Sequence, residues 1–298
     1  MWDQPDFERD VDQGRFYLPD AEELKRETIV TSVIDAKPEV VARLPGPSWI
    51  PLWAAITIGG FFVLGTYHLW MLALVSLVIG TGIIIYWLWT GTAWIPEKPE
   101  KGIGLGLTLP LYNSGPASVG WWAMFITMLA LLTAFISLVF AYYFFWTIHP
   151  DFPPGPASGP GAFWPVSGGV LILLAWGLTQ LAHRFNRTDR GTAFHAAAFG
   201  AMLMAAAGAA ALLAGPYVAN MDPEQHVYQA TVWLLLIWCA AHAALGILMN
   251  AYCIARRAAG RMTARHDIDI SNVALYWHFA TLMTVIAVAT VAGFPFVA

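Results

Sequence analysis

The chain has 298 residues, of which 58% are hydrophobic and only 11% are charged. In a typical soluble domain about a quarter of the residues are charged. One globular core therefore cannot bury all of the apolar surface of this chain. The composition therefore predicts an integral membrane protein in which lipid covers the rest. The net charge is −4, and no cluster of Lys or Arg is interleaved with aromatic residues in a soluble segment, so nucleic-acid binding is not expected.

Residues 1–48 are polar and contain many acidic residues and prolines. They end in Leu44-Pro45-Gly46-Pro47-Ser48, a rigid break before the first apolar stretch. We expect an irregular cytoplasmic segment here.

Seven later stretches approach the roughly 20 apolar residues that a membrane-spanning helix needs. These stretches predict an all-α polytopic bundle of about seven transmembrane helices. Almost nothing separates the first two, so residues 49–90 are expected to form a helical hairpin. A cytoplasmic linker at 91–120 and a five-helix domain at 121–298 follow. The predicted spans are 49–69, 71–90, 121–146, 165–183, 194–214, 228–254 and 273–296.

The basic residues predict the orientation, because short cytoplasmic loops are enriched in Lys and Arg. With seven spans, all 15 basic side chains fall on the side of the N-terminus. That side is therefore expected to be cytoplasmic, and the C-terminus periplasmic. The basic residues are Arg9, Arg15, Lys25, Arg26, Lys37, Arg43, Lys98, Lys101, Arg184, Arg187, Arg190, Arg256, Arg257, Arg261 and Arg265.

The predicted spans contain none of the 19 Asp and Glu residues. Pumps and ion-coupled carriers usually keep ionisable groups within the membrane, so a self-contained pump is not expected. Among the eight histidines only His242 and His278 lie well inside apolar stretches, on different helices, which favours hydrogen-bonded structural roles over metal ligation. Cys239 and Cys253 are interpreted as small core thiols.

The helix predicted at 194–214 is dominated by Ala and Gly between Ala196 and Ala211. Small residues let membrane helices approach closely. We expect this helix to be central or packed tightly against another subunit.

The C-terminal third carries two motifs on consecutive predicted helices. His242-Ala243-Ala244-Leu245-Gly246 lies on the sixth, and Tyr276-Trp277-His278-Phe279 lies on the seventh. Together with Trp121-Trp122-Ala123-Met124-Phe125 on the third, they resemble cytochrome c oxidase subunit III over roughly residues 118–298. Near the N-terminus, Tyr17-Leu18-Pro19-Asp20 and Leu44-Pro45-Gly46-Pro47-Ser48-Trp49 are similar to the junction of fused subunit I+III chains.

Three side chains of the family pattern are absent from this sequence. Leu131 stands where the family has a buried glutamate, Cys239 replaces the first histidine of an HxxH pair, and Ala280 and Thr281 stand where an aspartate follows the YWHF motif. Whatever those carboxylates do in the family, this chain does not do in the same way.

The resemblance implies a non-catalytic, stabilising subunit of a haem–copper terminal oxidase in a bacterial inner membrane. Haem and copper are then expected in the partner subunit I, none of them in this chain, and subunits I and II and phospholipids are the expected partners. Electrons come from cytochrome c or, as an alternative, from quinol; a free-standing membrane carrier or scaffold is the remaining class. The residues expected to be structural or lipid-contacting are His242, Trp277, His278, Arg184 and Arg256.

Overall fold

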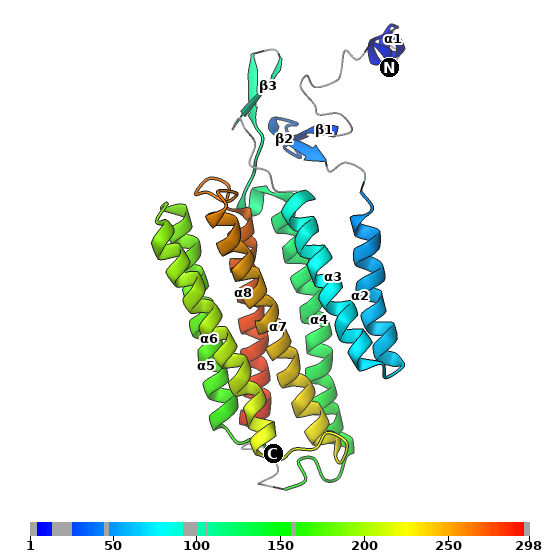
Figure 1. Cartoon of the computed structure of the whole chain (residues 1–298), viewed down its shortest axis with the longest axis vertical. Coiled ribbons are helices and arrows are strands. Elements are labelled where there is room, and N and C mark those ends of the chain that lie inside the picture. The colour runs from blue at the N-terminus through cyan, green and yellow to red at the C-terminus, as the bar shows by residue number, and fades with distance from the viewer. Residues whose placement is uncertain are drawn as a thin grey trace. The chain divides into compact units, whose positions relative to one another are not determined.

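The structure is a computed structural model that describes residues 5–13, 26–44, 48–91, 100–104, 106–155 and 159–294. The chain divides into two compact units, Met1–Asn113 and Ser114–Ala298. Figure 1 labels most of their helices and strands.

The first unit contains a pair of apolar helices, α2 (Ile50–Thr66) and α3 (Trp70–Gly91). Their turn places His68 in a left-handed conformation with φ of 58°. The helices pack closely through small residues: Ser76 donates a hydrogen bond of 2.7 Å to the carbonyl of Thr57, and a β-carbon on Gly80 would lie 2.7 Å from Ile58. Close approach of this kind is how helices associate where lipid supplies no hydrophobic drive. The predicted helical hairpin is present.

The polar parts of the first unit contain more regular structure than the sequence analysis predicts. A short helix α1 (Phe7–Asp12) is followed by an antiparallel pair, β1 (Arg26–Thr31) and β2 (Pro38–Leu44). A second pair, β3 (Glu100–Gly104) and β4 (Leu107–Pro110), lies in the predicted linker. The expectation of an irregular N-terminal segment was therefore wrong for residues 26–44.

The two β-hairpins are held together by a small core of their own. Val41 of β2 is fully buried and Leu109 of β4 nearly so. The side chains of Glu27 and Lys101 form a 2.5 Å ion pair and are 2% and 9% exposed. Short β-branched runs such as Thr28-Ile29-Val30 are too brief to stand out beside long apolar helices, which is why the sequence pattern did not reveal these strands.

The second unit is a bundle of the long helices α4 to α8, which pack side by side (Figure 1). Serine and histidine side chains cap two of them: Ser118 accepts a hydrogen bond from the backbone N–H of Trp121, and His226 accepts one from Tyr228. A 3₁₀ turn (Gly115–Ala117) precedes the bundle and a π-helical turn (Ala289–Gly293) ends it. The helices are α4 (Val119–Ile148), α5 (Phe163–Arg187), α6 (Gly191–Val218), α7 (Val227–Ala258) and α8 (Ile268–Val288).

The Ala- and Gly-rich helix α6 packs tightly against α5 and α7 of the same chain. A β-carbon on Gly168 of α5 would lie 2.8 Å from Leu212 of α6 and 3.0 Å from the carbonyl of Gly208. Its small residues do let α6 approach α5 closely, but α8, which packs against α4, α5 and α7, is the more central helix. Packing of α6 against another subunit stays a prediction.

In the described part of the chain, six helices are long and apolar enough to cross a membrane: Trp70–Thr90, Val119–Ile148, Phe163–Arg187, Gly191–Val218, Val227–Ala258 and Ile268–Gly293. The stretch predicted at 49–69 forms α2, which has only 17 residues. That length is about 25 Å, somewhat less than the roughly 30 Å of a hydrocarbon core. The chain is thus a mostly helical, multi-pass membrane protein with six candidate spans, and a seventh crossing depends on α2.

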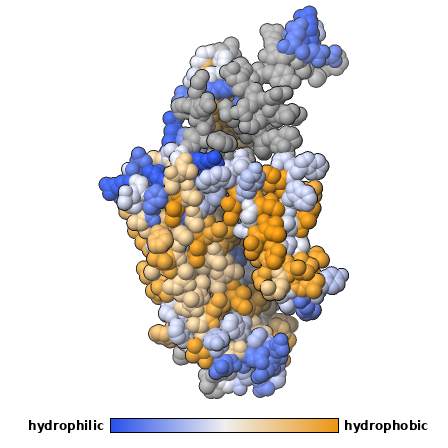
Figure 2. All heavy atoms as spheres, viewed as in Figure 1, coloured by the Kyte–Doolittle hydropathy of each residue, from blue (hydrophilic) through white to orange (hydrophobic). Residues whose placement is uncertain are grey.

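The helices of the second unit extend past the predicted spans at nearly every end. The last one, predicted from residue 273, begins at Ile268 and so includes Asp269. The prediction that no acidic residue lies within a span was therefore wrong for Asp269. On the face shown in Figure 2, hydrophobic residues run along the helices, and hydrophilic residues gather at their ends.

Candidate functional site

The two family-like motifs meet where α7 packs against α8. The hydroxyl of Tyr276 donates a 2.8 Å hydrogen bond to the carbonyl of His242. One turn further along α7, Gly246 lies against the indole of Trp277, which is fully buried. His242 itself is half-buried, and its Nδ1 lies 2.8 Å from the carbonyl of Trp238 in the preceding turn. We call this the motif contact; it locks α7 to α8.

His278 belongs to the same motif but points away from the motif contact. It is exposed, and its Nδ1 accepts a 3.0 Å hydrogen bond from the indole N–H of Trp176 on α5. A neutral imidazole that accepts at Nδ1 carries its proton at Nε2. His278 therefore presents a hydrogen-bond donor on the outside of the bundle.

A shallow groove runs beside His278 between α4 and α8. Its volume is about 200 Å³, and apart from His278 its lining is apolar. The lining residues follow helical spacing on both sides, Phe125 to Leu132 on α4 and Leu275 to Leu282 on α8. We call this the α4–α8 groove.

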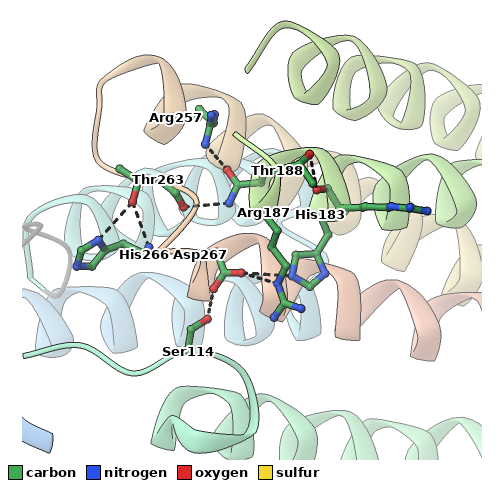
Figure 3. A network of polar contacts seen from close by, with 10 residues as sticks. Ser114, His183, Arg187, Thr188, Arg257, Thr263, His266 and Asp267 are labelled. Atoms are coloured by element: carbon green, nitrogen blue, oxygen red, sulfur yellow. Dashed lines mark hydrogen bonds and ion pairs between the residues drawn. The ribbon is translucent and has the colours of Figure 1, made fainter. Parts of the chain in front are cut away.

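A polar cluster gathers around Asp267 at the end of the bundle where α5 ends and α8 begins (Figure 3). One carboxylate oxygen of Asp267 lies 3.0 Å from Nε of Arg187 and 3.5 Å from Nε2 of His183. The other oxygen accepts a hydrogen bond from Ser114. Burial by itself raises the pKa of the carboxyl, but the hydrogen bonds from His183, Ser114 and Arg187 and the charge of Arg187 outweigh it and lower the pKa to about 2.

Neighbouring contacts tie the two loops at this end together. The side-chain amide of the buried Asn186 donates to the carbonyl of Thr263 at 3.0 Å and accepts from Arg257 at 2.5 Å (Figure 3). The same arginine lies 2.7 Å from the carboxylate of Asp189. The α5–α6 and α7–α8 loops are thereby joined through one amide and one guanidinium.

The buried Arg256 forms a further ion pair at this end. Its side chain is 4% exposed and lies 2.7 Å from the carboxylate of Asp269, and it donates to the carbonyl of Arg261 at 3.0 Å. The guanidinium thus holds the start of α8 against the end of α7. Arg184, by contrast, is exposed on the outer side of α5.

The charges of the second unit are divided between its two ends. All seven of its arginines lie at or near the α5–α6 and α7–α8 loops. The loops at the other end carry Asp151, Asp222 and Glu224 and no Lys or Arg. An asymmetry of this kind is typical of a membrane protein with its basic end in the cytoplasm.

The remaining predicted residues are placed as follows. Cys239 and Cys253 are buried free thiols, as predicted. Leu131 packs partly buried against the core, and the hydroxyl of the buried Thr281 has no hydrogen-bond partner among the described residues. Asp267, His183 and Ser114 were not predicted as site residues, because nothing in their local sequence indicates that they meet.

A scan against models of known protein families finds no match, and neither does a search of curated proteins. The class that the fold defines is a polytopic helical membrane protein with six candidate spans.

Proposed function

We propose that the chain is a non-catalytic, stabilising subunit of a haem–copper terminal oxidase, similar to subunit III. In this proposal it lies in a bacterial inner membrane beside subunits I and II, and subunit I holds the haems and copper. The complex takes electrons from cytochrome c and reduces oxygen to water. The chain contributes packing surface and lipid contacts, and no catalytic residue of its own.

The motif contact is the observation that supports this proposal most. The sequence resemblance rests on two motifs, one around His242 and one at Tyr276–Phe279. The residues that join them by a hydrogen bond, His242 and Tyr276, are 34 positions apart in the sequence. In the fold they form a single interface in which the tyrosine hydroxyl, the indole and a glycine fit together. Residues shared with a family of structural subunits thus have a structural role in this bundle.

The charge division of the second unit supports the proposed orientation. Seven arginines at one end and only acidic residues at the other fit a basic cytoplasmic end and a periplasmic end with the α4–α5 and α6–α7 loops. The N-terminus is then cytoplasmic if α2 crosses the membrane.

The test is co-purification from a mild detergent. The full chain carries an affinity tag and is expressed in the cells that produce it naturally. It should purify with other membrane proteins, and the preparation should show the visible absorption spectrum of haem. Oxygen consumption with reduced cytochrome c or with quinol then distinguishes the two donors. A stable, monodisperse chain that carries neither haem nor partner chains would overturn the proposal and favour a free-standing carrier or scaffold.

A pair of glycine variants makes the test specific for the motif contact. Gly246→Leu inserts a large side chain against Trp277, whereas Gly177→Leu on α5 has nothing within 4 Å of its β-carbon. We expect the first variant to lose haem-bearing partners during purification and the second to retain them. Equal retention in both variants would remove the motif contact as support.

A further inference from the structure

Two histidines meet at the end of the second unit that lies opposite the arginines. His149 follows the last residue of α4, and His226 precedes the first residue of α7. Their ring centroids are 4.9 Å apart, and the rings meet edge to face at 74°. Both residues lie just outside the candidate spans Val119–Ile148 and Val227–Ala258. The α4–α5 and α6–α7 loops therefore contact each other through this histidine pair.

Each imidazole also binds the backbone of its own segment. Nδ1 of His226 accepts a 3.0 Å hydrogen bond from the backbone N–H of Tyr228, and Nδ1 of His149 accepts one of 3.3 Å from the N–H of Asp151. A ring nitrogen accepts a hydrogen bond only while it carries no proton. Both bonds therefore require neutral rings, and protonation turns each acceptor into a donor that faces another N–H.

A phenylalanine makes a second contact between the same loop and α7. Phe152, three residues after His149, is 5% exposed. Its ring lies 5.0 Å from that of Tyr142 on α4 and 5.1 Å from that of Tyr228 on α7. The α4–α5 loop thus reaches the start of α7 through the histidine pair and through Phe152.

The histidine pair is poorly suited to carry charge. Nε2 of His226 is buried and has no hydrogen-bond partner among the described residues. A buried donor without an acceptor costs free energy, which exposure of the ring to water would recover. A positive charge at the start of α7 is also unfavourable, because the first turn of a helix carries a partial positive charge. Two protonated rings at this separation would in addition repel each other.

The other ionisable groups of this end are acidic or phenolic. The two loops contain Asp151, Asp222 and Glu224 and no Lys or Arg. The carboxylate of Asp222 accepts hydrogen bonds within its own loop, from the N–H of Glu224 and the side-chain amide of Gln225. Carboxyls ordinarily titrate near about pH 4 and phenols near about pH 10, whereas histidine titrates between about pH 5 and 8. The histidines are therefore the groups whose charge changes here in that range.

We propose that His149 and His226 form a pH-sensitive latch between the α4–α5 and α6–α7 loops. While both rings are neutral, they contact each other and each binds its backbone N–H. When the pair takes up protons in mildly acidic conditions, these hydrogen bonds break, the rings separate and the first turn of α7 becomes exposed. In the proposed orientation the latch senses the pH outside the cytoplasm, but the latch itself does not depend on the proposed function.

Amide hydrogen exchange of the full chain in detergent tests the latch. Exchange is measured by mass spectrometry of overlapping peptides at pH values from about 7.5 to 5 and corrected for the intrinsic pH dependence of amide exchange. Protection of the Tyr228 amide should fall at least about fivefold on acidification, the factor typical of a lost N-cap. The Trp121 amide, which the hydroxyl of Ser118 caps, is the internal control and should stay protected. Constant protection of Tyr228, or equal losses at both amides, would overturn the proposal.

Two asparagine variants assign the effect to the histidines. His226→Asn keeps an acceptor for the N–H of Tyr228, since asparagine is a favoured N-cap, but it does not titrate. Protection of Tyr228 should then be independent of pH. His149→Asn leaves one titrating ring, so protection should change about half as steeply with pH, because opening is coupled to one proton and not two. A pH dependence that survives in His226→Asn refutes the latch, and a slope that His149→Asn leaves unchanged refutes the pairing.

Discussion

Trp277 and Gly246 lie so close together that a β-carbon on the glycine would be 2.6 Å from the indole ring. The indole is fully buried, so it has no free space into which it can move. The contact therefore depends on residue 246 being glycine. It fixes the separation of α7 and α8 at the middle of the bundle.

Gly246→Ala should destabilise the protein even though alanine is the better helix former. Overpacking of a tight core costs about 1–3 kcal/mol, more than the roughly 1 kcal/mol that alanine gains over glycine in a helix. Thermal unfolding of the purified protein in detergent measures the effect. Gly177→Ala is the control, because its β-carbon meets nothing within 4 Å, and it should be neutral or slightly stabilising.

The carboxylate of Asp267 should make the bundle sensitive to acid. Its pKa is lowered from 3.8 to about 2 in the folded protein. As the pH falls, the unfolded chain therefore takes up a proton before the folded chain does. The stabilisation, roughly 2 kcal/mol, is fully present above about pH 4 and disappears as the pH falls towards 2.

Asp267→Asn should remove this part of the pH dependence. Unfolding temperatures between pH 5 and pH 2.5 should fall less steeply for this variant than for the unaltered chain. Asp151→Asn, an exposed carboxyl at the opposite end of the bundle, serves as the control and should leave the slope unchanged. A slope that Asp267→Asn leaves unchanged would mean that other carboxyls cause it.

The ion pair of the buried Arg256 with Asp269 should contribute more to stability than the exposed Arg184 does. Arg256→Ala leaves the half-buried carboxylate of Asp269, which is 23% exposed, without its partner; the cost should be below the roughly 3–5 kcal/mol of breaking a fully buried pair. Adding Asp269→Asn removes the unpaired charge and should recover part of that loss. Arg184→Ala should change the free energy of unfolding by less than about 0.5 kcal/mol, as exposed positions usually do.

Denaturation monitored by circular dichroism compares these variants directly. Equal losses for Arg256→Ala and Arg184→Ala would contradict the structural role assigned to the buried guanidinium.

The short helix α2 decides on which side the N-terminus lies. If α2 crosses the membrane, seven crossings place the two termini on opposite sides, with the N-terminus in the cytoplasm. Reporter fusions at each terminus, one active only in the cytoplasm and one only in the periplasm, should show this arrangement. Termini on the same side would mean that α2 does not cross and that only the six longer helices do.

Hydropathy along the chain was enough to find the long helices, because twenty consecutive apolar residues are a local property. The predicted stretch 121–146 lies within α4 and 228–254 within α7, each a few residues shorter than the helix. The ends were misjudged because helices continue into the polar interface, where residues such as Arg256 and Asp269 no longer look apolar. The strand pair of Arg26–Thr31 and Pro38–Leu44 went unseen because its core is only a few valines and isoleucines.

The arrangement of the candidate site residues was harder to predict from the sequence than the helices were. The family-like motifs identified His242, Trp277 and His278 as residues of interest, but the pattern gave no indication that Trp277 faces inward and His278 outward. That difference follows from the helical turn of 100° between neighbours combined with the positions of α5 and α7 around α8.

Hydrophobicity and charge are properties of single residues and of their order along the chain. The sequence alone was therefore enough to predict a multi-pass membrane protein with its arginines at one end of the bundle. Which side chains contact each other is decided only when the chain folds. Ser114 and Asp267 are 153 residues apart along the chain and yet share a hydrogen bond. Residues that are far apart along the chain give no sign in the sequence that they will meet. The polar cluster, the motif contact and the exposed donor of His278 therefore became visible only in the packed structure.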